Sequence, residues 1–261
     1  MGLNIIPAAR QSKIMELIKQ NGLVTVEALS KSLEVSVITI RRDLSLLEEK
    51  GVLERTHGGA ILTQKVEREF NYSEKDRINP QQKESIGRAA AALIEDGDTV
   101  FINSGSTTYQ VIRFLEDRKD VRVITNNVAA VADFGGRSGV EMILTGGLYR
   151  YQSNCLIGDF AVNTVNQIIT SKIIMGVDGL CFDKGLTSPV YQEAGITRSM
   201  MDRTQGPVIC VADASKLGKV TNFVIAPLAK VDIIVTDEFF DEDLRYDLEA
   251  LNIEIIKSEG K

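Results

Sequence analysis

The chain has 261 residues, of which 44% are hydrophobic and 25% are charged, and its formal net charge is −6. This length suffices for one or two domains that each bury a core, and the composition is ordinary for a soluble globular protein. The negative balance argues against a protein that coats nucleic acid non-specifically. We find no apolar stretch of about 18 residues and no charged segment followed by a short apolar one, which argues against membrane spanning and secretion.

The cysteines and the histidine limit the chemistry that the chain can perform. Cys155, Cys181 and Cys210 lie within apolar or strand-like runs, so we expect buried, reduced thiols in a cytoplasmic protein. None has metal-ligand spacing, and His57 is the only histidine. A zinc site or a His-based catalytic triad has almost nothing to be built from. We therefore expect no metal, no cofactor and no His-based catalytic triad.

Residues 1–62 are expected to form a small helical head. An apolar stripe predicts a first helix from about Ala8 to Gln20, ended by the stop signal Asn21-Gly22. Thr25 is expected to cap a second helix with a stripe of its own. The inward-facing residues of these two helices are predicted to be Ile14, Leu17, Ile18, Val26, Leu29 and Leu33.

A third helix is predicted to begin after Ser36, whose hydroxyl can accept a hydrogen bond from an early backbone N–H. Its apolar residues recur at spacings of three and four, which places Val37, Ile40, Leu44 and Leu47 on one buried face. The residues turned outward are then Ile38, Thr39, Arg41, Arg42 and Ser45. Small polar groups and paired arginines suit the major groove of DNA, where guanidinium groups bind phosphate oxygens or guanine. A solvated amphipathic helix explains this pattern equally well, so the neighbouring segments decide.

Two short apolar-rich runs flank the glycine turn His57-Gly58-Gly59 and predict a β-hairpin, the wing of a winged helix-turn-helix. Arg55 and His57 on this wing are candidates for contacts with the phosphate backbone or the minor groove. The head holds eight Lys and Arg against seven Asp and Glu, and the remainder holds 22 against 29. DNA affinity must therefore come from local placement of charge and from dimerisation. Asp43 is expected to orient Arg42 or to cap locally, because phosphate repels a carboxylate.

Residues 63–79 are expected to be a charged linker, and residues 80–261 a larger α/β domain that begins with a helix from Pro80 to Glu95. Short β-branched runs alternate there with helical patterns, which predicts a mainly parallel sheet. The predicted strands are Thr99–Asn103, Val121–Thr125, Glu141–Leu144, Lys172–Val177, Val208–Ala212, Asp232–Thr236 and Glu254–Lys257. The helices predicted between them are Thr107–Leu115, Val128–Phe134, Tyr191–Arg203 and Asp241–Leu251. Ligands of such sheets usually lie beyond the carboxyl ends of the strands.

Three segments follow predicted strands and could hold an anion. Asn103–Thr108 combines small residues, hydroxyls and a helix N-terminus, although a helix cap without a ligand explains it equally well. Thr145-Gly146-Gly147 is interpreted as a tight turn. Lys216 follows a strand within Asp213–Lys219, where a lysine is usually a solvated charge; beside a phosphate it would be a compact counter-charge.

A continuous set of head residues resembles the DeoR-type bacterial repressors. The resemblance implies a winged helix-turn-helix that binds operator DNA, with Ser36, Thr39, Arg41 and Arg42 at the interface. The matching residues are Val35-Ser36, Thr39-Ile40-Arg41-Arg42-Asp43-Leu44, Leu47-Glu48, Gly51, Leu53, Arg55 and His57-Gly58-Gly59-Ala60.

The larger domain resembles the effector domain of the same repressors, a fold similar to ribose-5-phosphate isomerase. The resemblance implies a bound phosphorylated sugar or related metabolite, with Asp178 and Glu193 toward its hydroxyls. The residues that it places toward the phosphate are Ser104, Gly105, Ser106, Thr107, Thr108 and Lys216. Many members carry Asp where this chain has Asn103, so the contact assigned to that position, and the identity of the sugar, stay open.

The rival interpretation is a sugar-phosphate isomerase or lyase, since Asp178, Lys184 and Glu193 are the ingredients of proton transfer next to a carbonyl. Gly179 stands where isomerases of this fold commonly carry an acid, and no Lys-Gly-Gly-Gly run follows Lys184, so binding without turnover is favoured. The working hypothesis is a cytoplasmic repressor of a carbohydrate-metabolism operon, a homodimer or homotetramer. Its sugar-phosphate effector changes the spacing of the DNA-binding heads.

Overall fold

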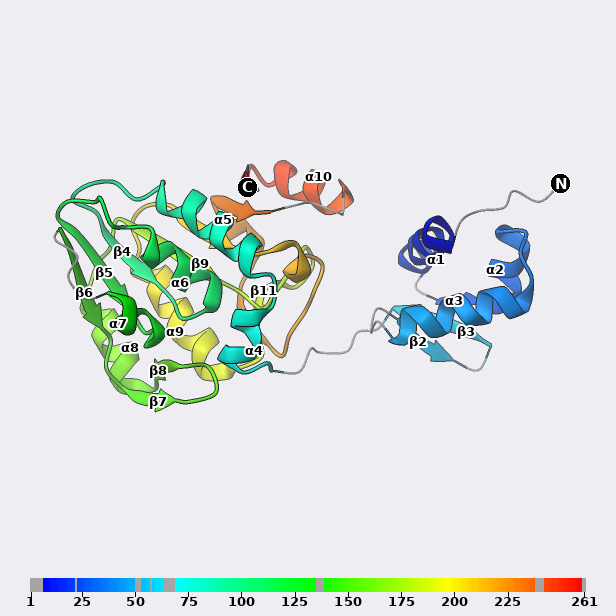
Figure 1. Cartoon of the computed structure of the whole chain (residues 1–261), viewed down its shortest axis with the longest axis horizontal. Helices are drawn as coiled ribbons and strands as arrows, with labels where there is room; N and C mark the ends of the chain where they lie inside the picture. The colour runs from blue at the N-terminus through cyan, green and yellow to red at the C-terminus, as the bar shows by residue number, and fades with distance from the viewer. Residues whose placement is uncertain are drawn as a thin grey trace. The chain divides into compact units, whose positions relative to one another are not determined.

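The computed structural model describes residues 7–21, 23–49, 53–56, 58–62, 69–134, 139–237 and 242–259. The chain divides into two compact units, Met1–Lys65 and Val66–Lys261, and each has a hydrophobic core of its own. Figure 1 shows the helices and strands of both units. Within the described residues, no helix is long and apolar enough to cross a membrane.

Three helices form most of the head, as the sequence predicts: α1 (Pro7–Asn21), α2 (Val26–Ser32) and α3 (Val37–Glu49). Both predicted caps are present. The Thr25 hydroxyl accepts from the Ala28 N–H at 3.1 Å, and the Ser36 hydroxyl accepts from the Thr39 N–H at 3.2 Å. The buried core is Ile14, Ile18, Val24, Val26, Leu29, Leu33, Ile40, Leu44, Leu47, Leu53 and Ala60, with Leu17 and Val37 half-buried at its margin.

The predicted wing is an antiparallel pair, β2 (Leu53–Thr56) and β3 (Gly59–Leu62), in which Arg55 pairs with Ala60. The sequence did not reveal β1 (Leu23–Thr25), which adds to β3 and gives the strand order β1-β3-β2. A Cβ atom at Gly59 would lie 2.0 Å from the carbonyl oxygen of Val24. Only glycine therefore lets β1 and β3 pair at this point.

The expectation for Asp43 was wrong. Its carboxylate is 3% exposed and binds Arg10 of α1, with Nε of Arg10 2.5 Å from Oδ2. The hydrogen bond to Asp43 raises the pKa of Arg10 above its usual value. The residue therefore fixes α3 to α1 from inside the head, and among the described residues its carboxylate has no hydrogen bond or ion pair with Arg42.

The larger unit is built on a seven-stranded sheet in which every pair is parallel. All seven predicted strands are present, with ends within one residue of those expected, and the order is β15-β14-β12-β9-β4-β5-β6. The chain runs outward from β4 to β6, then returns beside β4 and runs outward again to β15. The strands are β4 (Thr99–Ile102), β5 (Val121–Thr125), β6 (Val140–Leu144), β9 (Lys172–Gly176), β12 (Val208–Val211), β14 (Ile233–Thr236) and β15 (Glu254–Lys257).

Helices cover both faces of this sheet (Figure 1). Because successive strand residues point to opposite faces, Val100 and Ile102 pack with α5 and α6 on one side, and Phe101 with α8, α9 and α10 on the other. The helices are α5 (Pro80–Ala91), α6 (Ser106–Arg113), α7 (Ala129–Asp133), α8 (Asp159–Asn166), α9 (Tyr191–Asp202) and α10 (Glu242–Ala250). Of these, α8 was not predicted.

Smaller elements complete the unit. The hairpin β7 (Leu148–Arg150) and β8 (Cys155–Ile157) precedes α8, and a short helix, α4 (Tyr72–Arg77), forms within the segment expected to be a linker. An antiparallel sheet contains β10 (Gly179–Cys181), β11 (Gly185–Ser188) and β13 (Phe223–Ala226). Two 3₁₀ turns are η1 (Ala214–Lys216) and η2 (Leu228–Lys230).

The three thiols are not all buried, contrary to expectation. Cys155 and Cys210 are fully buried, and burial raises their pKa to about 11 and about 12. Cys181, at the end of β10, is only half-buried because its strand lies at the edge of the small sheet.

Candidate DNA-binding surface and effector cavity

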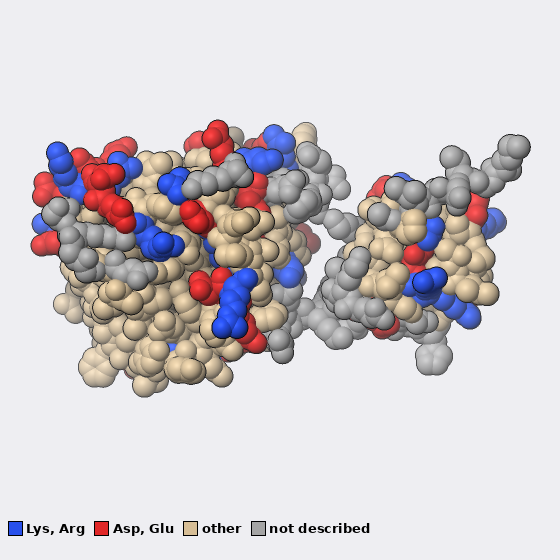
Figure 2. Space-filling view, in the orientation of Figure 1, with Lys and Arg blue, Asp and Glu red and all other residues tan. Residues whose placement is uncertain are grey.

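The outward face of α3 presents the residues that the sequence selected. Ser36, Ile38, Arg41 and Arg42 are exposed, and the Ser36 and Thr39 hydroxyls lie 2.9 Å apart at the start of the helix. Neither arginine forms an ion pair with another residue that the structure describes. Figure 2 shows basic side chains grouped over this helix. The two guanidinium groups are therefore open to an anion.

The wing residues are described less completely. The backbone of Arg55 lies in β2, but its side chain is outside the described part of the structure, as is all of His57. Ile38, with 78% of its side chain exposed beside the arginines, is the apolar member of the outward face. Such a side chain suits contact with a thymine methyl group.

A cavity of about 220 Å³ opens at the carboxyl ends of β4, β9 and β12. From β4 the chain adds strands toward one edge of the sheet, and from β9 it adds them toward the other edge. Ligands of open parallel sheets bind at the point between two such strands. The lining residues are Phe70, Tyr72, Lys75, Ile78, Lys83, Asn103, Ser104, Gly105, Ser106, Thr107, Ser153, Gly176, Val177, Asp178, Ser188, Glu193, Thr197, Asp213, Ser215, Lys216, Lys219 and Ile225. The expected position beyond the strand ends is thus where the cavity lies.

One part of the cavity is cationic. Lys83 of α5 and Lys216 of η1 both line it, close to the N-terminus of α6 that follows Gly105. The free N–H groups of a helix start add partial positive charge to that of the lysines. This arrangement suits a phosphate or another anion.

Lys83 is only 4% exposed, and burial lowers its pKa to about 8, although the neighbouring Asp213 partly opposes that shift. Its ammonium group donates to the carbonyl oxygen of Lys75. Asp213 is 1% exposed; Oδ1 accepts from the Asn79 amide and from the Ser215 N–H, while the buried Oδ2 has no hydrogen-bond partner among the described residues. The nearby carboxylate of Asp213 therefore offsets part of the cost of burying the charge of Lys83.

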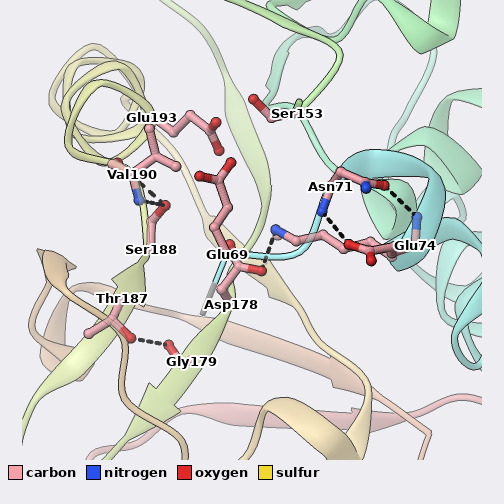
Figure 3. Close-up of polar contacts among 12 residues, drawn as sticks. Glu69, Asn71, Glu74, Ser153, Asp178, Gly179, Thr187, Ser188, Val190 and Glu193 are labelled. Carbon is pink, nitrogen blue, oxygen red and sulfur yellow. Dashed lines mark hydrogen bonds and ion pairs between the residues drawn. The ribbon is translucent and has the colours of Figure 1, made fainter. Parts of the chain in front are cut away.

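Two carboxylates occupy another wall. Asp178, directly after β9, forms an ion pair of 2.5 Å with Lys75, and Glu193 of α9 lies 3.5 Å from Arg150. Burial raises the pKa of Glu193, as does the nearby Asp178, while Lys75 and Arg150 oppose the shift. Figure 3 shows Glu69, Asp178 and Glu193 approaching one another from three parts of the chain. Carboxylates in such a group suit the hydroxyls of a polyol.

Asn103 acts as a clamp between two strands. Its Oδ1 accepts from the Gly176 N–H at 2.8 Å, and its Nδ2 donates to the Gly176 carbonyl at 3.0 Å and to the Thr197 hydroxyl at 3.2 Å. An aspartate could accept from Gly176 but could not donate to its carbonyl oxygen. The amide therefore joins the ends of β4 and β9, and its polar atoms are engaged within the protein.

The segment between the head and α5 forms part of the cavity wall. We call residues 69–78 the strap; it contains α4, whose start has a capping box between Asn71 and Glu74 (Figure 3). Glu69 forms an ion pair with Arg150, and the Tyr72 N–H donates to the Gln152 carbonyl at 2.6 Å. Together with the Lys75–Asp178 pair, these contacts hold the strap on the hairpin and on the end of β9.

The structure brings together most of the residues selected for the effector: Ser104, Gly105, Ser106, Thr107, Asp178, Glu193 and Lys216 all line the cavity. Thr108 does not, since it is fully buried and its hydroxyl donates to the Asn103 carbonyl at 2.7 Å. Lys184 is exposed in the turn between β10 and β11 and does not line the cavity. Gly146 and Gly147, between β6 and β7, are also exposed and outside the lining, and their positive φ angles fit a tight turn.

Sequence reasoning missed Lys83 and the strap. Lys83 stands three residues before Ile86 and seven before Ala90, on the inward stripe of α5, so its spacing gave a usable signal. The strap gave none, because its polar composition is that of an ordinary connection.

Two family descriptions match the chain. Residues 10–66 match the DeoR-like helix-turn-helix domain, and residues 78–238 match the DeoR C terminal sensor domain. The HTH-type transcriptional regulator GlpR of Haloferax volcanii is 32% identical over 252 residues, which cover 97% of this chain and 98% of that protein. The HTH-type transcriptional regulator GolR of Listeria innocua is 30% identical over 92% of this chain and 94% of its own length.

Among solved structures, ribose 5-phosphate isomerase A of Methanocaldococcus jannaschii matches 53% of this chain and 55% of its own. The TM-score is 0.39 and the identity 16%, and no conclusion about activity rests on so weak a likeness. The two domain matches and the full-length relatives agree with the exposed arginine pair and the cavity described above. The chain belongs to the DeoR family of DNA-binding transcriptional regulators.

Proposed function

We propose that this protein represses a carbohydrate-metabolism operon and responds to a phosphorylated sugar. The observation that carries the proposal is one cavity that is lined by lysines, by a helix N-terminus and by the carboxylates of Asp178 and Glu193. A phosphomonoester of a polyol offers the complementary groups, an anion and several hydroxyls.

The head is the part that we propose binds operator DNA. Ser36, Thr39, Arg41 and Arg42 would enter the major groove, with Arg55 and His57 of the wing on the phosphate backbone or in the minor groove. In this proposal residues 1–62 are the head, 63–79 connect it, and 80–261 sense the effector. Two or four chains would place heads on repeated half-sites, since one head with a net charge of +1 has little affinity by itself.

The strap supports a route from the cavity to the head. It is the chain segment that follows the head, and it holds to the cavity through the Lys75–Asp178 and Glu69–Arg150 pairs. A ligand hydroxyl that binds Asp178 or Glu193 competes with these pairs. Effector binding would thereby change where the connection to the head is anchored, which is the differential interaction that a population shift requires.

Catalysis is the second candidate, because Asp178 and the raised pKa of Glu193 resemble an acid–base pair. The cations Lys75 and Arg150 face these two carboxylates, and Lys184, the amine of the proposed isomerase set, lies outside the cavity. These positions support binding without turnover.

A thermal-shift screen against phosphorylated sugars tests the effector site. A ligand at a hundred times its Kd should stabilise the native protein by about 2.7 kcal/mol and raise its melting midpoint. Lys216→Ala should lose most of that shift and keep operator binding, since it removes only a charge at the cavity. Lys184→Ala, which removes an exposed lysine outside the cavity, is the matched control and should behave like the unmodified chain.

Two outcomes of this screen would contradict the proposal. One is a shift of equal size in Lys216→Ala and in the unmodified protein. The other is steady conversion of ribose 5-phosphate to ribulose 5-phosphate that Glu193→Ala abolishes, which would support an enzyme instead.

The pKa of Lys83 predicts how effector affinity depends on pH. A bound phosphate favours the protonated lysine and raises its pKa above the value of about 8 in the free protein. Binding then takes up a proton above pH 8, so the Kd should rise with pH there, by up to about tenfold per unit. A phosphomonoester with a second pKa near 6 contributes no titration of its own in this range.

Calorimetric titrations of one phosphorylated sugar between pH 7 and 9.5 measure this dependence. Lys83→Gln should bind more weakly and show a flat profile. A steep profile in Lys83→Gln would assign the pH dependence to another group.

The stability of the fold should depend on pH in the opposite direction to effector affinity. The pKa of Lys83 is lower in the folded chain than in the unfolded chain, so the contribution of this residue to the free energy of unfolding rises with pH between about 8 and 10.4.

A further inference from the structure

A long stretch of the larger unit is almost free of charge. Between residues 142 and 171 only Arg150 and Asp159 are charged, although a quarter of the whole chain is. Arg150 does not reach the surface as a free charge, because its side chain is 19% exposed and engaged with Glu69. This stretch forms the end of β6, the β7–β8 hairpin and α8.

The surface of these elements carries large apolar side chains instead. Figure 1 shows β6, the hairpin and α8 grouped at one end of the unit, and Figure 2 shows that this part is nearly without charged side chains in the same view. We call the six exposed residues the apolar face: Ile143 (40% exposed), Leu144 (39%), Leu148 (69%), Tyr149 (48%), Tyr151 (83%) and Phe160 (78%).

The parts of the face are fixed to one another. A Cβ atom on Gly147 would lie 3.1 Å from that of Ala161, so the start of β7 packs directly on the start of α8. The Tyr149 hydroxyl donates to Asn154 at 2.9 Å across the hairpin turn. The face is therefore pre-formed, and little conformational entropy is lost when it binds a partner.

The exposed area is close to what a stable interface needs. If a fully exposed large side chain presents about 200 Å², the six residues present about 700 Å² in total. A standard interface takes about 800 Å² from each partner. Monomeric proteins rarely leave an apolar patch of this size uncovered unless it binds something.

We propose that this face is the contact between two copies of the chain, related by a two-fold axis. The distribution of charge supports a second copy of the chain as the partner. Residues 63–261 hold 22 Lys and Arg against 29 Asp and Glu, so two copies repel each other over most of their surface. A face without charge avoids that repulsion and offers apolar area on both sides. In a two-fold contact the same patch meets itself, so no complementary second site is required.

The inference rests on the proposed function in one respect: a dimer supplies the two heads that paired operator half-sites require. Sedimentation velocity of the full chain tests it. The unmodified protein should have a mass of at least two chains of 28.7 kDa each. Tyr151→Glu/Phe160→Glu should raise the dissociation constant of self-association by about 100-fold or more, because each substitution places an unpaired carboxylate in the centre of the contact.

Tyr246→Glu is the matched control, since Tyr246 of α10 is 75% exposed and lies outside the apolar face. It should assemble like the unmodified chain. A monomeric unmodified protein at tens of micromolar would overturn the proposal, and so would an unchanged assembly in the double variant. Equal weakening by Tyr246→Glu would do the same, because the effect would then come from added charge alone.

Hydrogen exchange tests the same inference on the unmodified chain, so its result does not depend on whether a substituted protein folds. Amides of residues 148–160 should exchange more slowly at a concentration where the chain assembles than at one where it does not, and equal exchange would overturn the inference.

The proposed function and the proposed interface are contradicted by different results. A dimer without operator binding contradicts the proposed function and leaves the face standing, whereas an operator-binding chain whose assembly ignores Tyr151 and Phe160 contradicts only the face.

Discussion

Arg42→Ala should nearly eliminate binding to the operator while the head stays folded. The guanidinium is exposed on α3 and makes no ion pair with a described residue, so its removal costs no internal contact. A bidentate arginine–guanine pair contributes about 1–3 kcal/mol, which is roughly 5- to 150-fold in affinity. A dimer that binds two half-sites loses this contribution at both of them. Titration of labelled operator at several salt concentrations measures both the affinity and the number of phosphate contacts.

Lys31→Ala is the matched control for this experiment. Lys31 carries the same charge, is exposed, and lies in the last turn of α2 rather than on α3. Its removal should change operator affinity by a few-fold at most, with the salt slope almost unchanged. An Arg42→Ala protein that still shifts the operator at physiological salt would refute the assignment of α3 as the recognition helix.

Arg10→Ala should unfold the head even though it leaves every residue proposed to bind DNA in place. The Arg10–Asp43 pair is buried, with side-chain exposures of 11% and 4%. Removal of one partner of a buried pair leaves an uncompensated charge and costs about 3–5 kcal/mol. A unit of about 60 residues has a total stability of similar size. Operator binding should be lost, and urea unfolding followed by circular dichroism should show an early transition for the head.

Two further variants separate this effect from a loss of surface charge. Lys13→Ala breaks the Lys13–Glu16 pair on the same helix, in which both side chains are 49% exposed, and should cost less than about 0.5 kcal/mol. Arg10→Met/Asp43→Leu removes both buried charges and should recover most of the stability. A fully stable Arg10→Ala head would show that the buried pair contributes nothing to holding α1 on α3.

The sequence was most informative where hydrophobic periodicity is strong. The central strands of a parallel sheet are buried on both faces and have continuous apolar sequences, so Thr99–Ile102 and Val208–Val211 were found with their boundaries almost correct. The caps Thr25 and Ser36 were equally legible, because a short polar side chain before an apolar stripe has a local structural reason.

Pairings between distant residues were not legible. β1 has three residues and exists only because β3 lies beside it, and Arg10 meets Asp43 across 33 positions of the chain. Short strands and buried ion pairs depend on tertiary contacts, which the periodicity of one segment does not report.

The lining of the proposed effector cavity was also predictable only in part. The loop after β4 and Lys216 follow strands, and the topology of parallel sheets brings such positions together. Thr108 was misplaced because a helix N-terminus turns some of its hydroxyls back onto its own backbone, and only the rotation of α6 decides which. Lys75 could not be found, since its role depends on the strap folding back onto the cavity.

The shortness of α4 has a consequence for how the protein would respond to ligands. A helix of six residues does not persist alone in water, because nucleation costs more than so few backbone hydrogen bonds return. The helix is therefore stabilised by its contacts with the residues on which it packs. A ligand that replaced those contacts imperfectly would melt it, and a close stereoisomer that replaced them well would leave it intact. Two sugars of equal affinity could thus act as inducer and as silent competitor.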